Sequence, residues 1–510
     1  MNNSKSEIRS GIILNYINLI LGNLIPVFYT PIMLKLLGQG EYGLYKLSSN
    51  VVSYLSLISL GIGSAVTRYL IKARSENGQE EEERVLGLFT LIFAAISILT
   101  LLIGSFLAFH IDIWYRNSLT TAELTRMKIL VFIMVINTVI TFVFTPCSAV
   151  PGAHEKFVFV QGTNIVSTCV GPIVNLVVLF LGYKSVSLAI CSLVMQISLR
   201  IVYLFFVRSR MKIKISFHNM PLHLLREILT FSFWVFVSNV VGQLYNATDI
   251  AMIGAVPALA TTGVAVYNIG ATFNTIELGI TTGVSNLLAA RTNKMVFSGA
   301  STHELSDLMI RAGRIQAYII TLIISGFIAF GQPFLLFYAG EGYEDAYWVA
   351  ILLMVPNMIP LLESLCLTII IAENRHRFRS LVYLFIAISN VIGTWILLQY
   401  KGIVGAAAMT AISVLIGHGM IMNWYYYKKI GLDIPRFWKE IFKIMIIPVV
   451  MCVVTVSISV VVNFYSVLVL LSGIIIYTVL FCVLNWRFVM NSYEKEIVTQ
   501  LISPVLFRKD

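Results

Sequence analysis

Charged residues are scarce in this chain. Asp, Glu, Lys and Arg together make up 12% of the 510 residues, whereas hydrophobic residues make up 58%. In soluble proteins about a quarter of the residues are charged and about half are apolar. The composition, with a mean hydropathy of +0.86, therefore excludes an ordinary soluble protein. The length would allow several soluble domains, but the hydropathy indicates one integral membrane unit.

Cysteine and histidine are few, and their spacing is not that of metal ligands. The six cysteines lie in apolar stretches without a Cys-x-x-Cys pair, and the seven histidines show no His-Glu-x-x-His spacing. This pattern favours small buried side chains over disulfides or metal sites. We therefore expect no metal and no other cofactor. His418, which lies between two glycines, is interpreted as a packed core residue.

Long hydrophilic segments are also missing. The loops expected outside the membrane are short, the longest running from about 112 to 126, so no external domain is expected to hold a catalytic site. The first apolar run, from about 11 to 37, is too long for the apolar region of a cleavable signal peptide. It is therefore interpreted as a retained first span.

Most of the chain consists of apolar segments with the length of membrane helices. About 20 apolar residues cross the hydrocarbon core as a helix, because lipid forces every backbone polar group into internal hydrogen bonds. The predicted fold class is all-α integral membrane. Fourteen spans are predicted, at residues 10–37, 44–71, 85–110, 127–150, 157–182, 186–207, 227–254, 261–290, 309–336, 346–371, 379–398, 402–427, 440–462 and 466–488.

The second half of the chain repeats the first. The Leu-Gly-Ile of Leu60–Ile62 recurs at Leu278–Ile280 after 218 residues, and Tyr183-Lys184 recurs at Tyr400-Lys401 after 217. Two more matches, Arg9 with Arg226 and Met134-Val135 with Met354-Val355, have nearly the same separation in sequence. Such a duplication of a helical unit is typical of transporters.

The repeat predicts two six-helix lobes in parallel orientation. They occupy residues 1–220 and 221–430, and an additional helix pair with a cytoplasmic tail occupies residues 431–510. With the N-terminus inside, 27 Lys and Arg residues lie on the inner side and 7 on the outer side, so both termini are predicted to be cytoplasmic. The net charge of +11 then faces anionic lipid, and no nucleic-acid partner is expected.

Polar and charged residues within the spans are candidates for function, because they are costly in hydrocarbon. Candidate substrate-binding residues are Arg68, Arg200, Arg291, Asn239, Gln243 and Asn246. Arg68 could instead extend to the inner headgroups, and Arg200 could pair with an acid. The repeat puts Asn286 opposite Arg68, so this charge is not part of the duplicated scaffold.

Acidic residues within the spans are candidates for ion coupling. They are Asp249, Glu277 and Glu363. Asp249 continues the stripe of Asn239, Gln243 and Asn246, which indicates a cavity wall rather than contacts between helices. Glu277 and Glu363 are interpreted either as proton or cation sites or as partners that neutralise the arginines.

Several segments resemble the polysaccharide flippases of bacterial cell-surface assembly. Leu36-Leu37-Gly38, then Tyr42–Tyr45, then Leu60–Gly63 leading to Arg68 carry the resemblance, together with the inner loop Pro151–Phe157. The likeness covers residues 5–430. It is to the Wzx-like family of the multidrug/oligosaccharidyl-lipid/polysaccharide exporter superfamily.

The resemblance implies a multi-pass protein of the bacterial inner membrane with two lobes around a central cavity. The implied cargo is an undecaprenyl-diphosphate-linked oligosaccharide for O-antigen, capsule or another surface polymer. Arg68, Arg200 and Arg291 would make the cavity basic, which suits a diphosphate. The expected partners are this cargo, membrane lipid, and a polysaccharide polymerase with its chain-length machinery.

Two other functions compete with the flippase interpretation. Cation-coupled extruders of the same superfamily tend to have an acid in the first span, whereas no Asp or Glu lies between Glu7 and Glu41. A membrane-embedded polymerase would need a large outer loop, and an acyltransferase an intramembrane histidine with a matching acid. The short loops and the isolated His418 argue against both enzymes.

Overall fold

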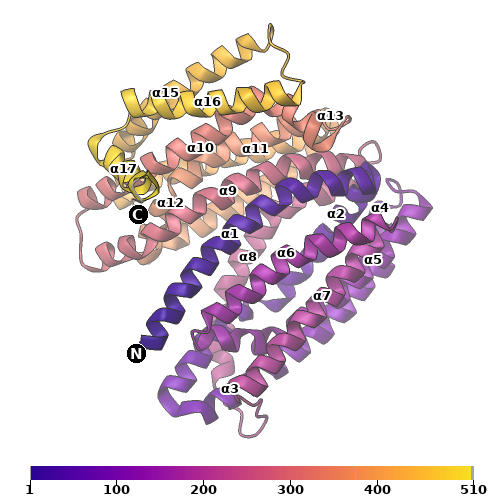
Figure 1. Ribbon diagram of the computed structural model, residues 1–510. Helices are drawn as coiled ribbons and strands as arrows, with labels where there is room; N and C mark the ends of the chain where they lie inside the picture. Colours follow the sequence, from indigo (N-terminus) through magenta and orange to yellow (C-terminus); the bar gives the residue numbers. More distant parts are fainter. Residues whose placement is uncertain (1, 374, 507–510) are drawn as a thin grey trace. The chain divides into compact units, whose positions relative to one another are not determined.

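The protein is built almost entirely of helices joined by short loops (Figure 1). The computed structural model describes residues 2–373 and 375–506, and no strand occurs in these two ranges. The prediction of an all-α membrane fold is confirmed. The chain divides into two compact units, the first ending at Asn268 and the second beginning at Ile269.

The first unit contains eight α-helices and the start of a ninth. Their bounds are α1 (Asn2–Leu37), α2 (Gln39–Ser53), the 3₁₀ turn η1 (Tyr54–Ser59), α3 (Ile62–Phe109), α4 (Asp112–Tyr115), α5 (Thr121–Ala153), α6 (Phe157–Phe180), α7 (Ser185–Phe205), the π-helical turn η2 (Phe206–Arg210), α8 (Leu224–Ala255) and the first residues of α9 (Ala260–Phe297). Thr120 starts α5 with a capping box, in which its side chain accepts from the Glu123 amide.

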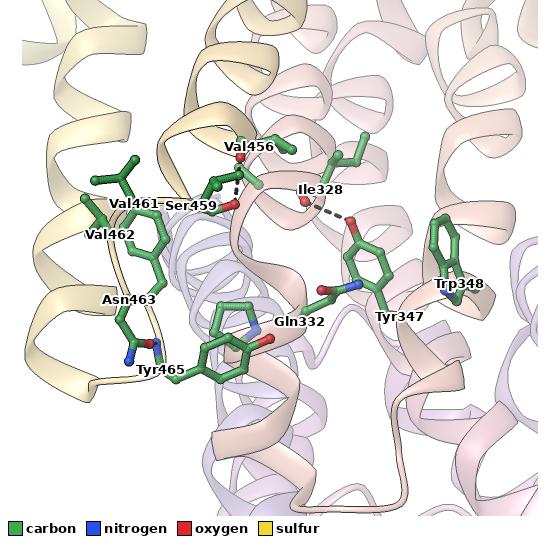
Figure 2. Close-up of a pocket in the computed structure, with 14 residues that line it drawn as sticks. Ile328, Gln332, Tyr347, Trp348, Val456, Ser459, Val461, Val462, Asn463 and Tyr465 are labelled. Atoms are coloured by element: carbon green, nitrogen blue, oxygen red, sulfur yellow. Dashed lines mark hydrogen bonds between the residues drawn. The ribbon is translucent and has the colours of Figure 1, made fainter.

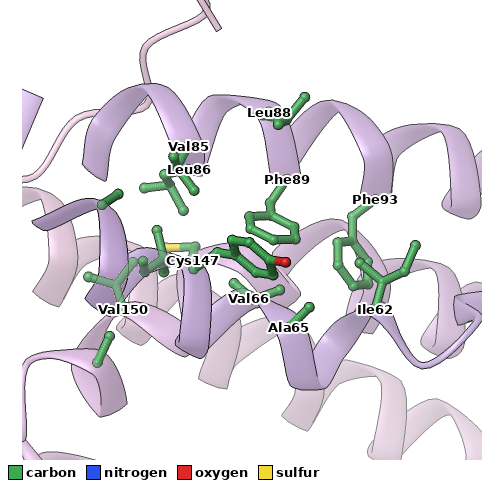
Figure 3. Packing of buried hydrophobic residues seen from close by; sticks show 14 of the residues in the cluster. Ile62, Ala65, Val66, Val85, Leu86, Leu88, Phe89, Phe93, Cys147 and Val150 are labelled. Atoms are coloured by element: carbon green, nitrogen blue, oxygen red, sulfur yellow. The ribbon is translucent and has the colours of Figure 1, made fainter. Parts of the chain in front are cut away.

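The core of the first unit lies between α3 and α5 (Figure 3). Gly78, with a φ of 78°, breaks α3 into two arms that fold back on each other, a backbone conformation that favours glycine. Phe89 and Phe93 of the second arm pack against Val66 of the first and against Cys147 of α5. Lipid is as apolar as these side chains, so close packing rather than exclusion of water holds such helices together.

A close approach between α2 and the start of α9 depends on Gly43. A Cβ at this position would lie 1.7 Å from the backbone oxygen of Thr261. The neighbouring Tyr42 is buried, and its hydroxyl donates to Asn268 Oδ1 at 2.9 Å. Tyr42 and Gly43, which belong to one of the segments that carry the family resemblance, therefore have a packing role inside the first unit.

The second unit contains the remainder of α9 and the helices that follow. Their bounds are α10 (Thr302–Ala339), α11 (Asp345–Leu362), α12 (Ser364–Ala372), α13 (His376–Val414), η3 (Leu415–Met422), α14 (Asn423–Tyr425), η4 (Tyr426–Ile430), α15 (Ile434–Ile458), α16 (Val467–Phe488) and α17 (Ser492–Leu506). The α15–α16 hairpin packs on α10, where the Phe330 ring meets the edges of Phe464 and Tyr477 at centroid distances of 5.2 and 5.6 Å.

Eleven helices in the described ranges are long and apolar enough to cross a membrane. The protein is therefore a multi-pass membrane protein. Helices that continue through Gly78 and Gly402 count as single segments, and α2 and α9 are not among the eleven. The count of fourteen spans and the two lobes at 1–220 and 221–430 stay predictions.

Arg314 of α10 fixes the C-terminal helices to the second unit. Its side chain is only 6% exposed and donates from Nε and Nη2 to the two oxygens of Glu494, at 2.5 and 3.0 Å. Nη1 donates to Glu440 of α15 at 2.9 Å, and the Tyr318 hydroxyl also donates to Glu494. One guanidinium therefore joins α10, α15 and the first turn of α17.

Replacing Gly43 by alanine should impair folding, because the new methyl group would overlap the Thr261 carbonyl. We expect a loss of at least about 2 kcal/mol of stability, measured as a fall in the thermal unfolding midpoint in detergent. Gly40→Ala is the matched control, since a Cβ there would lie 3.8 Å from Thr261 Oγ1, an ordinary contact. Equal midpoints for the two variants would contradict the packing role.

Replacing Arg314 by alanine should destabilise the second unit, because Glu494 would stay buried without its cation. Breaking a buried ion pair on one side costs about 3–5 kcal/mol. Thermal unfolding of the purified protein measures the loss. Arg311→Ala on the same helix removes an exposed arginine that lies over the Tyr493 ring at 5.7 Å, and should cost less than about 1 kcal/mol. A small effect of Arg314→Ala would show that α17 is held by other contacts.

Candidate functional site

Arg200 of α7 is a half-buried cation inside a predicted span. Nη1 donates to Ser148 Oγ of α5 at 2.9 Å, and Nη2 donates to Gln196 Oε1 at 3.4 Å. Nε is buried and has no hydrogen-bond partner among the described residues. Within residues 2–373 and 375–506, no carboxylate forms an ion pair with this guanidinium, so its charge is solvated by neutral groups alone.

Arg68 lies on the first arm of α3 and is exposed in the structure. Its guanidinium carbon stands 4.9 Å from the centroid of the Phe231 ring of α8, the geometry of a cation–π contact. In the described part of the chain it forms no ion pair. The side chain of Asn286, its counterpart in the repeat, lies outside the described residues.

A small polar cavity lies inside the first unit between α2, η1, α5 and α7. Its volume is about 280 Å³, and its lining includes Tyr45, Ser53, Asn137, Thr138 and Ser192. The Asn137 amide donates to Ser192 Oγ at 3.4 Å. Because Ser192, Gln196 and Arg200 are four residues apart on α7, they form one polar stripe that continues from this cavity to Arg200.

Two residues of the predicted polar stripe on α8 form hydrogen bonds with neighbouring helices. Gln243 donates to Ser53 Oγ, which lines the same cavity, at 2.5 Å, and the buried Asp249 accepts from the Tyr267 hydroxyl at 2.5 Å. Asn239 is exposed, and the side chain of Asn246 lies outside the described residues. The stripe thus brings Gln243 to the cavity and sets Asp249 in a contact between helices.

Glu363 of the second unit lies at the break between α11 and α12, which follows Pro356 and Pro360. It is 2% exposed, and its Oε1 accepts from the indole N–H of Trp438 at 3.2 Å. The same N–H donates to Asn423 Oδ1 at 3.0 Å. The second carboxylate oxygen of Glu363, Oε2, is buried without a partner among the described residues.

Among the other predicted residues of the second unit, His418 contacts this group of Glu363, Trp438 and Asn423 through its backbone oxygen, which accepts from Asn423 Nδ2 at 3.0 Å. Glu277 of α9 is fully buried, and neither of its carboxylate oxygens has a hydrogen-bond partner in the described ranges. Arg291, further along α9, is exposed. His418 contacts the Tyr383 hydroxyl through Nδ1 at 3.1 Å. Neither glutamate pairs with an arginine in the part of the chain that is described.

A further cluster connects the Pro151–Phe157 loop to α3. Nε2 of His154 lies 2.7 Å from Glu82 Oε1, and Arg74 Nη1 lies 2.8 Å from His154 Nδ1. An arginine can only donate, so Nδ1 accepts and Nε2 carries the proton toward Glu82. His154 therefore joins the C-terminal end of α5 to both arms of α3.

Sequence reasoning missed several residues that define these sites. Ser148 and Ser53 are ordinary residues of apolar helices, and nothing in their spacing marks them. Ser192 could have been found, because it lies four residues before Gln196 and eight before Arg200, on the same helix face. Trp438 lies in the helix pair outside the repeat. In the sequence, Arg314 looks like another of the cations assigned to the inner loops. Only the structure shows that it is buried and contacts Glu494, 180 residues later.

Metal ligation is not suggested by the geometry. In residues 2–373 and 375–506, no group of three or more His, Cys, Asp or Glu side chains is placed to hold an ion. The sites described above are instead built from hydroxyl, amide, guanidinium and isolated carboxyl groups, which bind sugars and anions or exchange protons.

Comparison with known proteins gives a family and a fold. A family model described as "Polysaccharide biosynthesis protein" matches residues 8–301, and no curated protein matches. Among solved structures, the lipid II flippase MurJ in an inward closed conformation matches with a TM-score of 0.72 at 17% identity, covering 94% of this chain and 98% of that one.

Two transporters of the MATE family match as well. One, an inward-facing member of the MOP superfamily, has a TM-score of 0.60 at 15% identity and covers 84% of this chain and 99% of its own. The Vibrio cholerae transporter VcmN has a TM-score of 0.58 at 12% identity, with coverage of 86% and 100%. These three are flippases or transporters, not enzymes. Since the family model spans more than half of the sequence, the chain belongs to the polysaccharide biosynthesis protein family, and it has the fold of MurJ and the MATE transporters.

Proposed function

We propose that this protein is a flippase that moves an undecaprenyl-diphosphate-linked oligosaccharide across the bacterial cytoplasmic membrane for surface polysaccharide synthesis. Membership of the polysaccharide biosynthesis family supports the sugar, and the fold shared with a lipid II flippase supports the lipid carrier. A diphosphate and a sugar chain cannot cross hydrocarbon unaided, so a polar route through the protein is required.

The observation that carries the proposal is the uncompensated charge of Arg200. A buried cation is costly unless it is paired, and here its partners are one hydroxyl and one amide. An anionic ligand would supply the missing charge, with the guanidinium donating to phosphate oxygens. The polar stripe from Arg200 to the cavity between α5 and α7 would then contact sugar hydroxyls.

The remaining candidates take complementary roles in this proposal. Arg68 and Arg291 are exposed and would draw the diphosphate toward the protein from the cytoplasmic side. Asn239, Gln243 and Asn246 would contact sugar hydroxyls, because amides both donate and accept. Both termini would be cytoplasmic, and a six-helix lobe from each half would rock to expose the site alternately on the two sides.

Cation coupling is the second candidate mechanism, favoured by the acids of the second unit. Glu277 and Glu363 are buried, and neither has a basic partner in the described residues. Such carboxyl groups, together with Asp249, are suited to bind and release a proton or a cation during transport. The same chemistry would serve a cation-coupled multidrug or metabolite extruder. Association with a polymerase and its chain-length machinery would follow if the cargo is an O-antigen or a similar repeat unit.

Deleting the gene should strand lipid-linked repeat units on the cytoplasmic face, because nothing else would carry the diphosphate across. Surface glycan measured on whole cells should fall, and lipid-linked oligosaccharide extracted from membranes should accumulate. The orientation is checked by adding a glycosidase to intact spheroplasts, which should not reach the accumulated sugar. Normal surface glycan with a loss of drug resistance would instead support the extruder.

Replacing Arg200 by glutamine should reduce export by about tenfold or more, because a charge-assisted hydrogen bond contributes about 1.5–3 kcal/mol. Protein levels in the membrane should stay unchanged, since Gln can still donate to Ser148. Arg208→Gln is the control, because Arg208 is an exposed arginine two turns further along the same helical segment. Equal export by the Arg200 and Arg208 variants would argue against phosphate binding by Arg200.

Replacing Arg68 by alanine should also reduce export. Full activity of this variant would assign Arg68 to the headgroup region.

A further inference from the structure

A second cavity lies in the second unit, and none of the predicted site residues lines it. It is enclosed by α10, the first turn of α11 and the connection between α15 and α16 (Figure 2). Its volume of about 500 Å³ is within the range of small-molecule sites, about 300–1,000 Å³. An adjoining space of about 320 Å³ shares Gln332, Tyr347, Trp348 and Tyr465 with it.

Aromatic rings from two separate elements line this cavity. Trp348 of α11 is 51% exposed, and Tyr465 of the α15–α16 connection is 54% exposed. Tyr347 is held in place, because its hydroxyl donates to the Ile328 backbone oxygen at 2.9 Å (Figure 2). Large rings with one polar end offer flat apolar faces together with hydrogen-bonding edges. Such faces match the C–H faces of sugar rings.

Neutral polar groups are placed around these rings. Gln332 lies on α10, Ser459 lies at the start of the α15–α16 connection and Asn463 lies in its middle (Figure 2). Asn463 Oδ1 accepts from the Tyr465 amide at 2.9 Å, and the side chain of Asn463 is exposed where it lines the cavity. The adjoining space is lined by Tyr343, which is 4% exposed and whose hydroxyl has no hydrogen-bond partner in the same ranges. A buried hydroxyl without a partner points to a ligand that can hydrogen-bond to it.

The charges at the rim are negative. Glu344 and Asp345 line the adjoining space, and no Lys or Arg lines either part of the cavity. Backbone N–H groups, its own and that of Gly342 at 3.0 Å, lower the pKa of Glu344. An ionised carboxylate at the rim can accept from hydroxyl groups and disfavours an anionic ligand.

We propose that this cavity is a binding site for an uncharged sugar unit. It depends on the α15–α16 hairpin, which has no counterpart in the sequence repeat, and so assigns a role to that extra helix pair. In the orientation proposed above it opens on the outer side of the membrane. The inference rests on the proposed function for the source of its ligand, which is the sugar head of the cargo after translocation, held apart from its diphosphate.

The test is direct binding by the full-length protein in nanodiscs of phosphatidylethanolamine and phosphatidylglycerol. The probes are methyl glycosides of N-acetylglucosamine, galactose, glucose and rhamnose, with galactose 1-phosphate as the charged probe. Saturation-transfer NMR and tryptophan fluorescence measure the affinity. At least one methyl glycoside should bind with a dissociation constant of about 1 mM, and galactose 1-phosphate should bind at least about tenfold more weakly.

Variants test whether the binding uses this cavity. Trp348→Ala and Asn463→Ala should each weaken glycoside binding by about tenfold, through loss of the ring face and of the amide donor. Trp395→Ala is the matched control, because Trp395 of α13 is 47% exposed and does not line the cavity. Tyr343→Phe should weaken binding without altering the thermal unfolding midpoint.

Three results of the binding measurements would overturn the proposal. They are no binding of any methyl glycoside, equal effects of Trp348→Ala and Trp395→Ala, and equal binding of galactose 1-phosphate. A Trp348 fluorescence response to lipid composition alone would make the aromatic residues headgroup anchors, which also overturns it. Because binding is measured without transport, glycoside binding can persist when gene deletion strands no lipid-linked sugar. The failures of the two proposals are therefore distinguishable.

Discussion

Hydrocarbon solvates neither a charge nor an unpaired peptide group, and every site in this protein reflects that constraint. The helices satisfy their own backbones, so the remaining problem is the few ionisable side chains. The charge of Arg314 is fully compensated, because two glutamates, a tyrosine and a backbone carbonyl surround its guanidinium. The Arg200 guanidinium has only two neutral hydrogen-bond partners, one hydroxyl and one amide, so its charge is not compensated. That difference separates a structural arginine from one suited to a ligand.

The last eighty residues are more closely integrated than their place outside the repeat indicates. Trp438 of α15 donates to Glu363, and Glu440 and Glu494 pair with Arg314. Phe464 packs edge-on against Phe330, next to the cavity proposed to bind sugar. The hairpin and α17 therefore support the second unit at two places along α10, one at Arg314 and one at Phe330.

Much of the fold could be predicted from the sequence, and much less of the sites. Runs of apolar residues indicate membrane helices wherever they occur, so the all-α class followed from composition. The limits of single spans were harder, because α3 continues through Gly78 and α13 through Gly402. Among the candidate residues, Arg200 was identified for its cost in lipid, but its partner Ser148 was not. A serine in an apolar helix carries no pattern that distinguishes it from a packing residue.

What the sequence determined by itself was the membrane class and the residues that are expensive in lipid, since both depend only on composition along the chain. The tertiary structure decided which of those residues have partners. Glu82 meets His154 and Arg314 meets Glu494, while Glu277 meets no hydrogen-bonding group in the described residues. These outcomes depend on which helix faces come together across many residues of chain, and the energy of a buried charge depends on the few atoms within hydrogen-bonding distance.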